Sequence, residues 1–180
     1  MPTFAYSGRT RAGQTVSGER IADTMDAAVA ALRREQIMSG NESSAIGSLR
    51  AINTANASYS SAAGQGGYST DLKVLGAPCP GSAQGFISPD LGDPALPSPV
   101  VKSGYNVLLA VSATGAAGPN DCNGTATQTD FYATSVPVTV GTTGNRGFSS
   151  NAAGTIFFDP TGVAPTEAQM APGGGGTPIQ

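Results

Sequence analysis

The chain has 180 residues, enough for one ordinary domain or two small ones, and a formal net charge of −3. This acidic balance, with only 12% charged residues, argues against nucleic-acid binding, which relies on Lys and Arg to neutralise phosphates. The absence of His removes the usual general base and the commonest metal ligand. We therefore expect no enzyme activity, no catalytic residues and no metal or other cofactor.

Residues 1–38 have the pattern of a small ββα unit. Residues 3–6 alternate in the manner of a strand, 8–13 form a turn bounded by glycines, and 14–21 return as a second strand. A helix follows, capped by Asp23 or Thr24. Its apolar face comprises Met25, Ala28, Val29, Leu32 and Ile37, and Arg33 and Arg34 lie near its C-terminal end.

Four parts of this unit occur in a defined order and spacing. They are the aromatic strand Phe4–Tyr6, the turn Gly8–Gly13, the segment Val16–Asp23 (VSGxxxAD) and the helix Ala27–Ile37, which ends LRxxxI. In these parts, residues 1–37 resemble the opening of the F-type inner-membrane platform proteins of type IV pilus and type II secretion machines. That family continues with cytoplasmic helical domains and membrane spans, which do not follow here.

A second helical pattern covers residues 41–63. Its larger apolar side chains, Ile46, Leu49, Ile52 and Tyr59, recur at spacings that place them on one helical face. We predict a helix of about six turns whose apolar face packs on a sheet, and which ends at the glycines of residues 64–67. The sequence leaves open whether the helix at 24–37 continues into it, because Gly40 costs only about 1 kcal/mol in a helix interior.

The rest of the chain favours an antiparallel sheet of three or four strands between about residues 102 and 158, within an α+β fold. The predicted segments are a Pro-rich surface loop at 78–99, strands at 102–112 and 130–140, a strand pair at 144–158 around a turn at 151–154, and a loosely ordered tail at 160–180.

Two cysteines, Cys79 and Cys122, are neither a CxxC pair nor close to other metal-ligand residues. In a loop-rich chain, we interpret them as one disulfide formed in an oxidising compartment; two buried free thiols are the alternative. Closing a loop of that length would add roughly 3–4 kcal/mol in the chain-entropy model.

The segment from Met38 to Ala55, MSGNESSAIGSLRAINTA, is followed further along by SGY, ATSVPV, TGNRGF and GTIFF in that order. Over residues 38–165, the chain resembles the globular domain of type IV pilins and type II secretion pseudopilins. The resemblance implies a filament subunit, but the hydrophobic first half of the pilin helix and its peptidase site are missing. Two families are thus joined without their membrane parts, which favours an engineered fusion over a natural one.

Several residues have an alternative chemical interpretation. A Ser–Lys dyad would have to use Lys73 or Lys102, which precedes Ser103, but a solvated Lys beside a turn Ser is the favoured interpretation. Asp90 and Asp93 could act as paired carboxylates or calcium ligands, but turn formation explains them without a ligand.

Other candidates lie in the loops. Asp121 and Asp130 flank a loop where some pseudopilins bind calcium, but no acidic ladder accompanies them. Asn123 begins an N-x-T glycosylation acceptor, which is relevant only in a glycosylating secretory pathway. The motif at 144–147, GNRG, lacks the context of a phosphate loop.

We therefore predict two units, a ββα domain at 1–38 and a pilin-like domain at 39–180. The expected function is structural: a subunit of a type IV pilus or secretion pseudopilus, whose partners are other pilin subunits and assembly proteins. In the parents, the pilin part would lie in the inner membrane, periplasm and extracellular filament, and the opening unit at the cytoplasmic face. We expect this chain itself to be soluble. The alternatives are a cytoplasmic adaptor of the machine and a secreted adhesion module.

Overall fold

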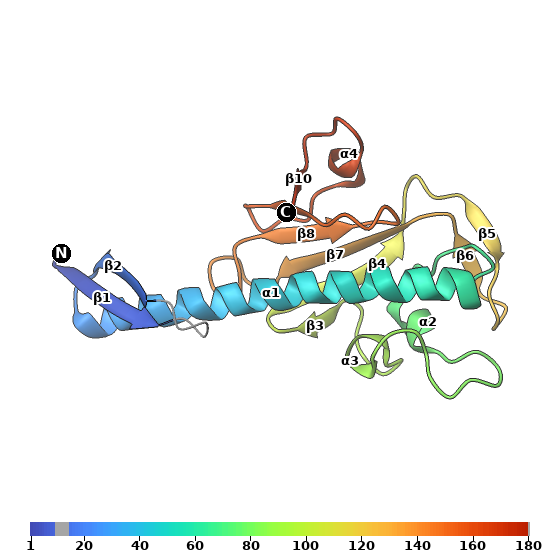
Figure 1. Ribbon diagram of the computed structural model, residues 1–180, viewed down its shortest axis with the longest axis horizontal. Helices are drawn as coiled ribbons and strands as arrows, with labels where there is room; N and C mark the ends of the chain where they lie inside the picture. The colour runs from blue at the N-terminus through green and yellow to red at the C-terminus, as the bar shows by residue number, and fades with distance from the viewer. Residues whose placement is uncertain (10–14, 180) are drawn as a thin grey trace.

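The computed structural model describes residues 1–9 and 15–179, which form an α+β fold with one long helix and antiparallel sheets (Figure 1). Helix α1 (Met25–Ala62) has 38 residues and is therefore about 57 Å long. A β-hairpin lies beside its first part, and a larger sheet lies along its second part (Figure 1). The predicted fold class is confirmed at this level. We call residues 1–40 the arm and residues 41–179 the head.

Local signals define both ends of α1. Thr24 is the N-cap, and its side chain accepts a hydrogen bond of 3.2 Å from the backbone N–H of Ala27. Beyond the helix, Gln65 and Gly66 adopt positive φ angles of 51° and 94°, a conformation that ends helices and favours glycine.

The two helical patterns of the sequence form one continuous helix. Gly40 lies inside α1, and the boundary predicted between residues 38 and 39 therefore falls within a helix. Gly40 keeps its backbone N–H, so it lowers helix stability by about 1 kcal/mol without breaking the hydrogen-bond pattern. The arm and the head thus share one continuous helix.

The arm hairpin consists of β1 (Thr3–Arg9) and β2 (Thr15–Ile21), paired antiparallel. Most of the predicted turn, and residue 14 of the predicted second strand, lie outside the described residues. The hairpin packs on one side of α1, where Ala28 is buried and Arg20 forms an ion pair with Glu35.

The head contains a six-stranded antiparallel sheet in the order β10-β9-β8-β7-β4-β3, rather than the three or four strands predicted. The strands that the prediction missed are short, and each is held in the sheet by pairing with a neighbouring strand. A tight turn with positive φ angles at Ser103 and Gly104 folds β3 back on β4. The strands are β3 (Val100–Lys102), β4 (Tyr105–Val111), β7 (Phe131–Pro137), β8 (Gly147–Ser150), β9 (Phe157–Asp159) and β10 (Thr177–Pro178).

The prediction of a loosely ordered tail was wrong, because this segment belongs to the fold. It contains α4 (Glu167–Met170) as well as β10, which extends the sheet (Figure 1). Met170 is buried, and the Tyr132 hydroxyl donates a hydrogen bond of 2.8 Å to the carbonyl of Pro165. The tail thereby covers part of the sheet face that α1 leaves free.

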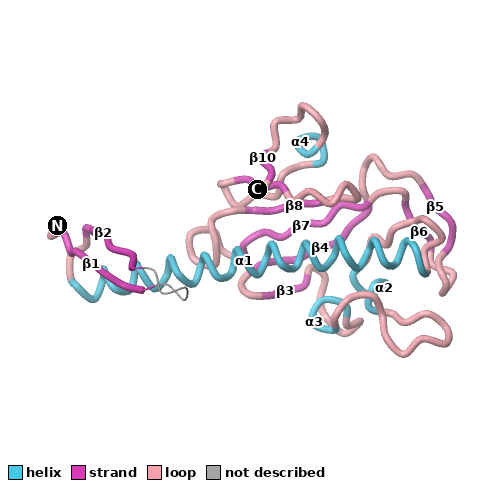
Figure 2. Tube along the Cα trace, viewed as in Figure 1, coloured by secondary structure: helices cyan, strands magenta, loops and turns pink. Residues whose placement is uncertain are grey.

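Shorter elements lie near the C-terminal end of α1, joined by long loops (Figure 2). They are α2 (Leu72–Gly76), α3 (Pro89–Gly92) and a two-stranded sheet of β5 (Ala117–Asn120) and β6 (Ala126–Gln128). Helix α3 lies in the predicted Pro-rich loop and buries Leu91. In the part of the chain that the structure describes, no helix has both the length and the apolar character needed to cross a membrane.

Candidate functional site

The most elaborate arrangement in the head is the contact between α1 and the sheet, which we call the helix seat. The helix contributes a stripe of buried residues spaced by three and four, which lie on one face. The stripe residues are Glu42, Ala45, Leu49, Ile52, Asn56 and Tyr59. Polar residues therefore occur within the buried stripe, and each of them has hydrogen-bond partners.

Three of the four residues predicted for the packing face are fully buried. Leu49, Ile52 and Tyr59 are at most 1% exposed and belong to the core, whereas Ile46 is only partly buried at its edge. Burial of each large apolar side chain contributes about 1.5–3 kcal/mol. The sheet and neighbouring elements meet them with a core that includes Tyr105, Val107, Leu109, Phe131, Ala133 and Phe148.

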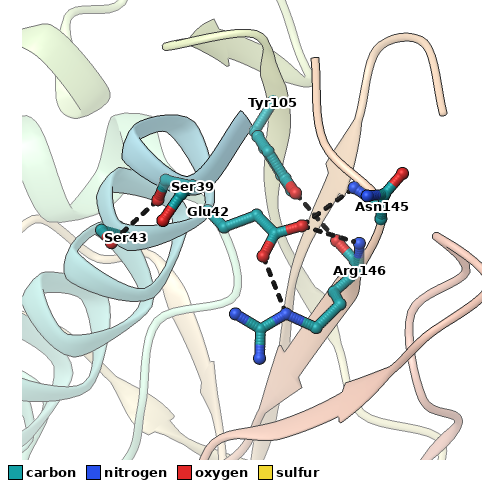
Figure 3. A network of polar contacts seen from close by, with 6 residues as sticks. All are labelled: Ser39, Glu42, Ser43, Tyr105, Asn145 and Arg146. Atoms are coloured by element: carbon teal, nitrogen blue, oxygen red, sulfur yellow. Dashed lines mark hydrogen bonds and ion pairs between the residues drawn. The ribbon is translucent and has the colours of Figure 1, made fainter. Parts of the chain in front are cut away.

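A carboxylate fixes the helix seat at the end nearest the arm (Figure 3). One oxygen of Glu42 accepts the backbone N–H groups of Asn145 and Arg146, at 2.9 and 3.2 Å. The other oxygen accepts a hydrogen bond of 2.8 Å from Nε of Arg146. The hydroxyl of Tyr105 donates to the carbonyl of Arg146 at 2.9 Å. This Glu42 cluster ties α1 to the start of β8.

The surroundings of the Glu42 cluster favour the ionised carboxylate. Burial by itself would raise the pKa of Glu42, but the hydrogen bonds from Asn145 and Arg146 outweigh it and hold the pKa below its usual value. The guanidinium of Arg146 also lies over the rings of Phe148 and Phe158, at 5.4 and 5.3 Å from their centroids. The arginine is therefore held by a charge and by two aromatic faces.

Side-chain amides continue the helix seat along α1. The Nδ2 atom of Asn41 donates to the carbonyl of Thr143 at 2.9 Å. Further along, Asn56 both donates to the carbonyl of Ser69 at 3.1 Å and accepts its backbone N–H at 2.9 Å. Asn56 thus ties the loop after α1 to the buried face of the helix, and a shift of that loop would leave the amide buried without partners.

The far end of the helix seat is joined to the disulfide. The Tyr59 hydroxyl donates to Asp121 at 2.8 Å, and burial together with this carboxylate raises the pKa of Tyr59. Asp121 also accepts the backbone N–H groups of Asn123 and Thr125, at 2.8 and 2.7 Å.

Cys79 and Cys122 form a disulfide, as the sequence predicted, and the N–H of Cys122 donates to the carbonyl of Ala63 at 3.1 Å. The loop around the disulfide is therefore attached directly to the last turn of α1.

The residues considered as a dyad or as paired carboxylates are engaged in structural contacts. Lys102 forms an ion pair with Asp90, which holds the pKa of that carboxyl below its usual value. Ser103 instead accepts a hydrogen bond of 3.0 Å from the hydroxyl of Ser44. Asp93 accepts the N–H of Ala95 at 2.8 Å, as a turn-forming aspartate does.

The residues considered for calcium also act within the chain. Asp130 accepts the backbone N–H groups of Phe131 and Ala152, at 2.8 and 2.9 Å, and Asp121 is engaged as described. No group of three metal-ligating side chains occurs among residues 1–9 and 15–179. Asn123 of the glycosylation motif is exposed, as are Arg33 and Arg34 in the arm.

A cleft of about 570 Å³ opens beside α2 and α3. Glycine and proline form much of its wall, with Phe86 as its aromatic residue and Gln84, Ser88 and Asp93 as polar ones. Most of its lining residues belong to the Pro-rich segment at 78–99.

The Glu42 cluster was missed at the sequence level. Its partner Arg146 lies 104 positions away, and no local pattern indicates such a distant pair. One signal was present, since Glu42 continues the spacing of Ala45, Leu49 and Ile52 toward the N-terminus. A charged residue in phase with an apolar stripe predicts a buried partner of opposite charge.

Comparison with known proteins identifies only the opening of the chain. The family model of the type II secretion system protein F, N-terminal domain, matches residues 1–41. The chain has no significant match to a curated protein or to a solved structure. The resemblance of the arm to the F-type platform proteins is thus supported, and it connects the chain with secretion or pilus machinery in general.

Proposed function

We propose that this chain is a pilin-type structural subunit of a type IV pilus or a type II secretion pseudopilus, and that it has no enzymatic role. The observation that carries the proposal is the helix seat. A helix of 38 residues has its second part fixed on an antiparallel sheet, while its first part projects from the head (Figure 1). Such a projecting helix is suited to pack beside helices of neighbouring subunits.

Two further observations support the proposal. The pilin-like sequence from Met38 to Ala55 coincides with the part of α1 that enters the helix seat. The family match of residues 1–41 connects the chain with a secretion machine. The partners would be pilin or pseudopilin subunits and the proteins that assemble them. In the parent, the head would be exposed to the periplasm or the outside, where its disulfide is stable.

The helix seat is suited to resist a pull along α1. Its polar contacts lie near both ends of the buried stripe, at Glu42 and at Tyr59, with apolar packing between them. A pull along α1 would have to break charge-assisted hydrogen bonds and apolar contacts together.

The family match also favours a second candidate, an adaptor in which the arm binds an assembly ATPase or a platform protein. Photo-cross-linking in a bacterium that assembles such a machine distinguishes the two. A cross-linking amino acid would replace Arg50, exposed on the seated part of α1, or Val29, exposed in the arm.

For a structural subunit, we expect cross-links from Arg50 to pilin or pseudopilin subunits. Cross-links from Val29 to an ATPase or platform protein, with none from Arg50 to a pilin, would reject the structural role in favour of the adaptor.

A further inference from the structure

The arm exposes several large apolar side chains. Ile21, Met25 and Ile37 are each at least 60% exposed, and Val29 is 40% exposed. Ala28 is the one apolar residue of the described part of the arm that belongs to the buried core. A single hairpin on a single helix encloses little, and contiguous exposed apolar surface of this kind marks interaction sites.

The exposed apolar residues Val29 and Ile37 lie on the side of α1 away from the hairpin. Ala28 and Glu35 mark the side that contacts β1 and β2, since Ala28 is buried there and Glu35 pairs with Arg20. On the opposite side, a face of five exposed residues follows helical spacing. We call it the arm face; it consists of Asp26, Val29, Ala30, Arg33 and Ile37.

A groove continues the arm face toward the head. Its volume is about 510 Å³, and it lies between α1 and the turn that connects β7 to β8. The helix contributes Ala30, Arg33, Arg34, Ile37 and Asn41, and the turn contributes Thr142 and Thr143. The groove is therefore open on the same side of α1 as the exposed apolar residues.

The order of charges along the arm face is self-complementary. Asp26 and Arg33 lie about two helical turns apart, with Val29 and Ala30 midway between them. If two such faces meet in antiparallel orientation, Asp26 of each copy lies opposite Arg33 of the other. Both side chains are exposed, and neither forms an ion pair within the described residues.

We propose that the arm face binds the arm face of a second copy of this chain, in an antiparallel, two-fold symmetric dimer. The axis passes near Val29 and Ala30, where the small alanine permits close approach. Ile37 of each copy then lies near Ile21 and the start of α1 in the other copy. The start of α1 in that copy occupies the groove. Each surface patch contacts its own equivalent, as a two-fold dimer requires.

The contact covers about 20 Å of helix, from residue 25 to residue 37, and is smaller than a standard stable interface. The dimer is therefore weak, and its population depends on protein concentration. This inference does not depend on the pilin-type role of the head.

Sedimentation velocity of the full chain over a range of concentrations tests the proposal. We expect a monomer–dimer equilibrium for the unchanged chain. Asp26→Arg alone, or Arg33→Asp alone, places like charges opposite each other and should weaken the dimer at least about tenfold. The double variant, Asp26→Arg with Arg33→Asp, restores opposite charges across the axis and should restore dimerisation.

Two further variants complete the test. Glu19→Arg changes an exposed charge on β2, outside the arm face, and should leave the equilibrium unchanged. Val29→Cys should form a disulfide between copies under mild oxidation, because the native cysteines are already bonded to each other. The proposal is rejected if the unchanged chain remains monomeric at all concentrations, or if the single charge reversals have no more effect than Glu19→Arg.

Discussion

The two parts of α1 are helical for different reasons. In the arm, the helical sequence MDAAVAALRREQ is rich in Ala, Leu, Arg and Glu, which have high intrinsic helix propensity. In the head, the sequence NESSAIGSLRAINTANASYSS is rich in Ser, Asn, Gly and Thr, which are poor helix formers. The arm part is therefore supported by local propensity, whereas the head part depends on the helix seat.

This difference has a consequence for function. A helix that depends on packing forms only when the sheet is in place, so the head folds as one cooperative unit. The arm helix is supported by its intrinsic propensity and by the hairpin, and most of its side chains remain exposed. The same helix thus combines a part fixed by the sheet with a part whose surface is exposed.

Removing the disulfide should have the largest effect on the head. Replacement of Cys79 and Cys122 by Ala releases a loop of 43 residues and should lower the free energy of unfolding by about 3–4 kcal/mol. Urea denaturation followed by tyrosine fluorescence measures this, because the chain has five Tyr and no Trp. Equal stability of the two forms would mean that the loop is held by its other contacts alone.

Replacing one apolar residue in each part of α1 tests the comparison directly. Leu49→Ala leaves a cavity in the core and should lower the free energy of unfolding by about 3 kcal/mol. Val29→Ala, in the exposed arm, should change it by less than about 0.5 kcal/mol. Circular dichroism during urea denaturation compares the two variants. Similar losses would show that the arm is packed as tightly as the head, which would contradict the distinction.

The Glu42 cluster should make the head sensitive to acid. Hydrogen bonds hold the pKa of Glu42 below its unfolded value, so its contribution is complete above about pH 4.3. The contribution is then lost as pH falls through the pKa of the folded state. Glu42→Gln should cost about 1.5 kcal/mol at pH 7, because an amide NH₂ would face the Nε donor of Arg146.

The measurement is the stability of both forms between pH 7 and pH 3. The difference between them should shrink below about pH 4 as the carboxylate is protonated. A difference that is constant over the whole range would show that the carboxylate charge contributes nothing.

Much of the head could be predicted because its signals are local. The glycines after α1 end the helix, and the turn at Asn151–Gly154 closes with a backbone hydrogen bond of 2.9 Å between its ends. The strand predicted at 102–112 contains β4, whose alternating burial matches its sequence. Each of these depends on residues within one element or one turn.

The missed features depend on contacts between distant segments. The strands β9 and β10 have three and two residues, too few to produce a periodic pattern. They pair with each other although α4 separates them in the sequence. The tail is held by Glu167, whose carboxylate accepts the N–H of Ala113 at 2.9 and 3.1 Å. Composition alone describes this segment as rich in Gly and Pro, which is typical of a loose tail.

Two glycines of α1 offer the finest test of the comparison between arm and head. Gly47 lies in the seated part and Gly40 at the end of the arm, and a Cβ at either position would meet no other atom. Gly47→Ala should therefore raise the free energy of unfolding by about 0.5–1 kcal/mol, since it reduces backbone freedom in the unfolded chain. Gly40→Ala should raise the global value less, because the arm opens without unfolding the head, and should instead slow amide hydrogen exchange around residue 40. Equal global stabilisation by both variants would show that α1 unfolds as a single unit from arm to head.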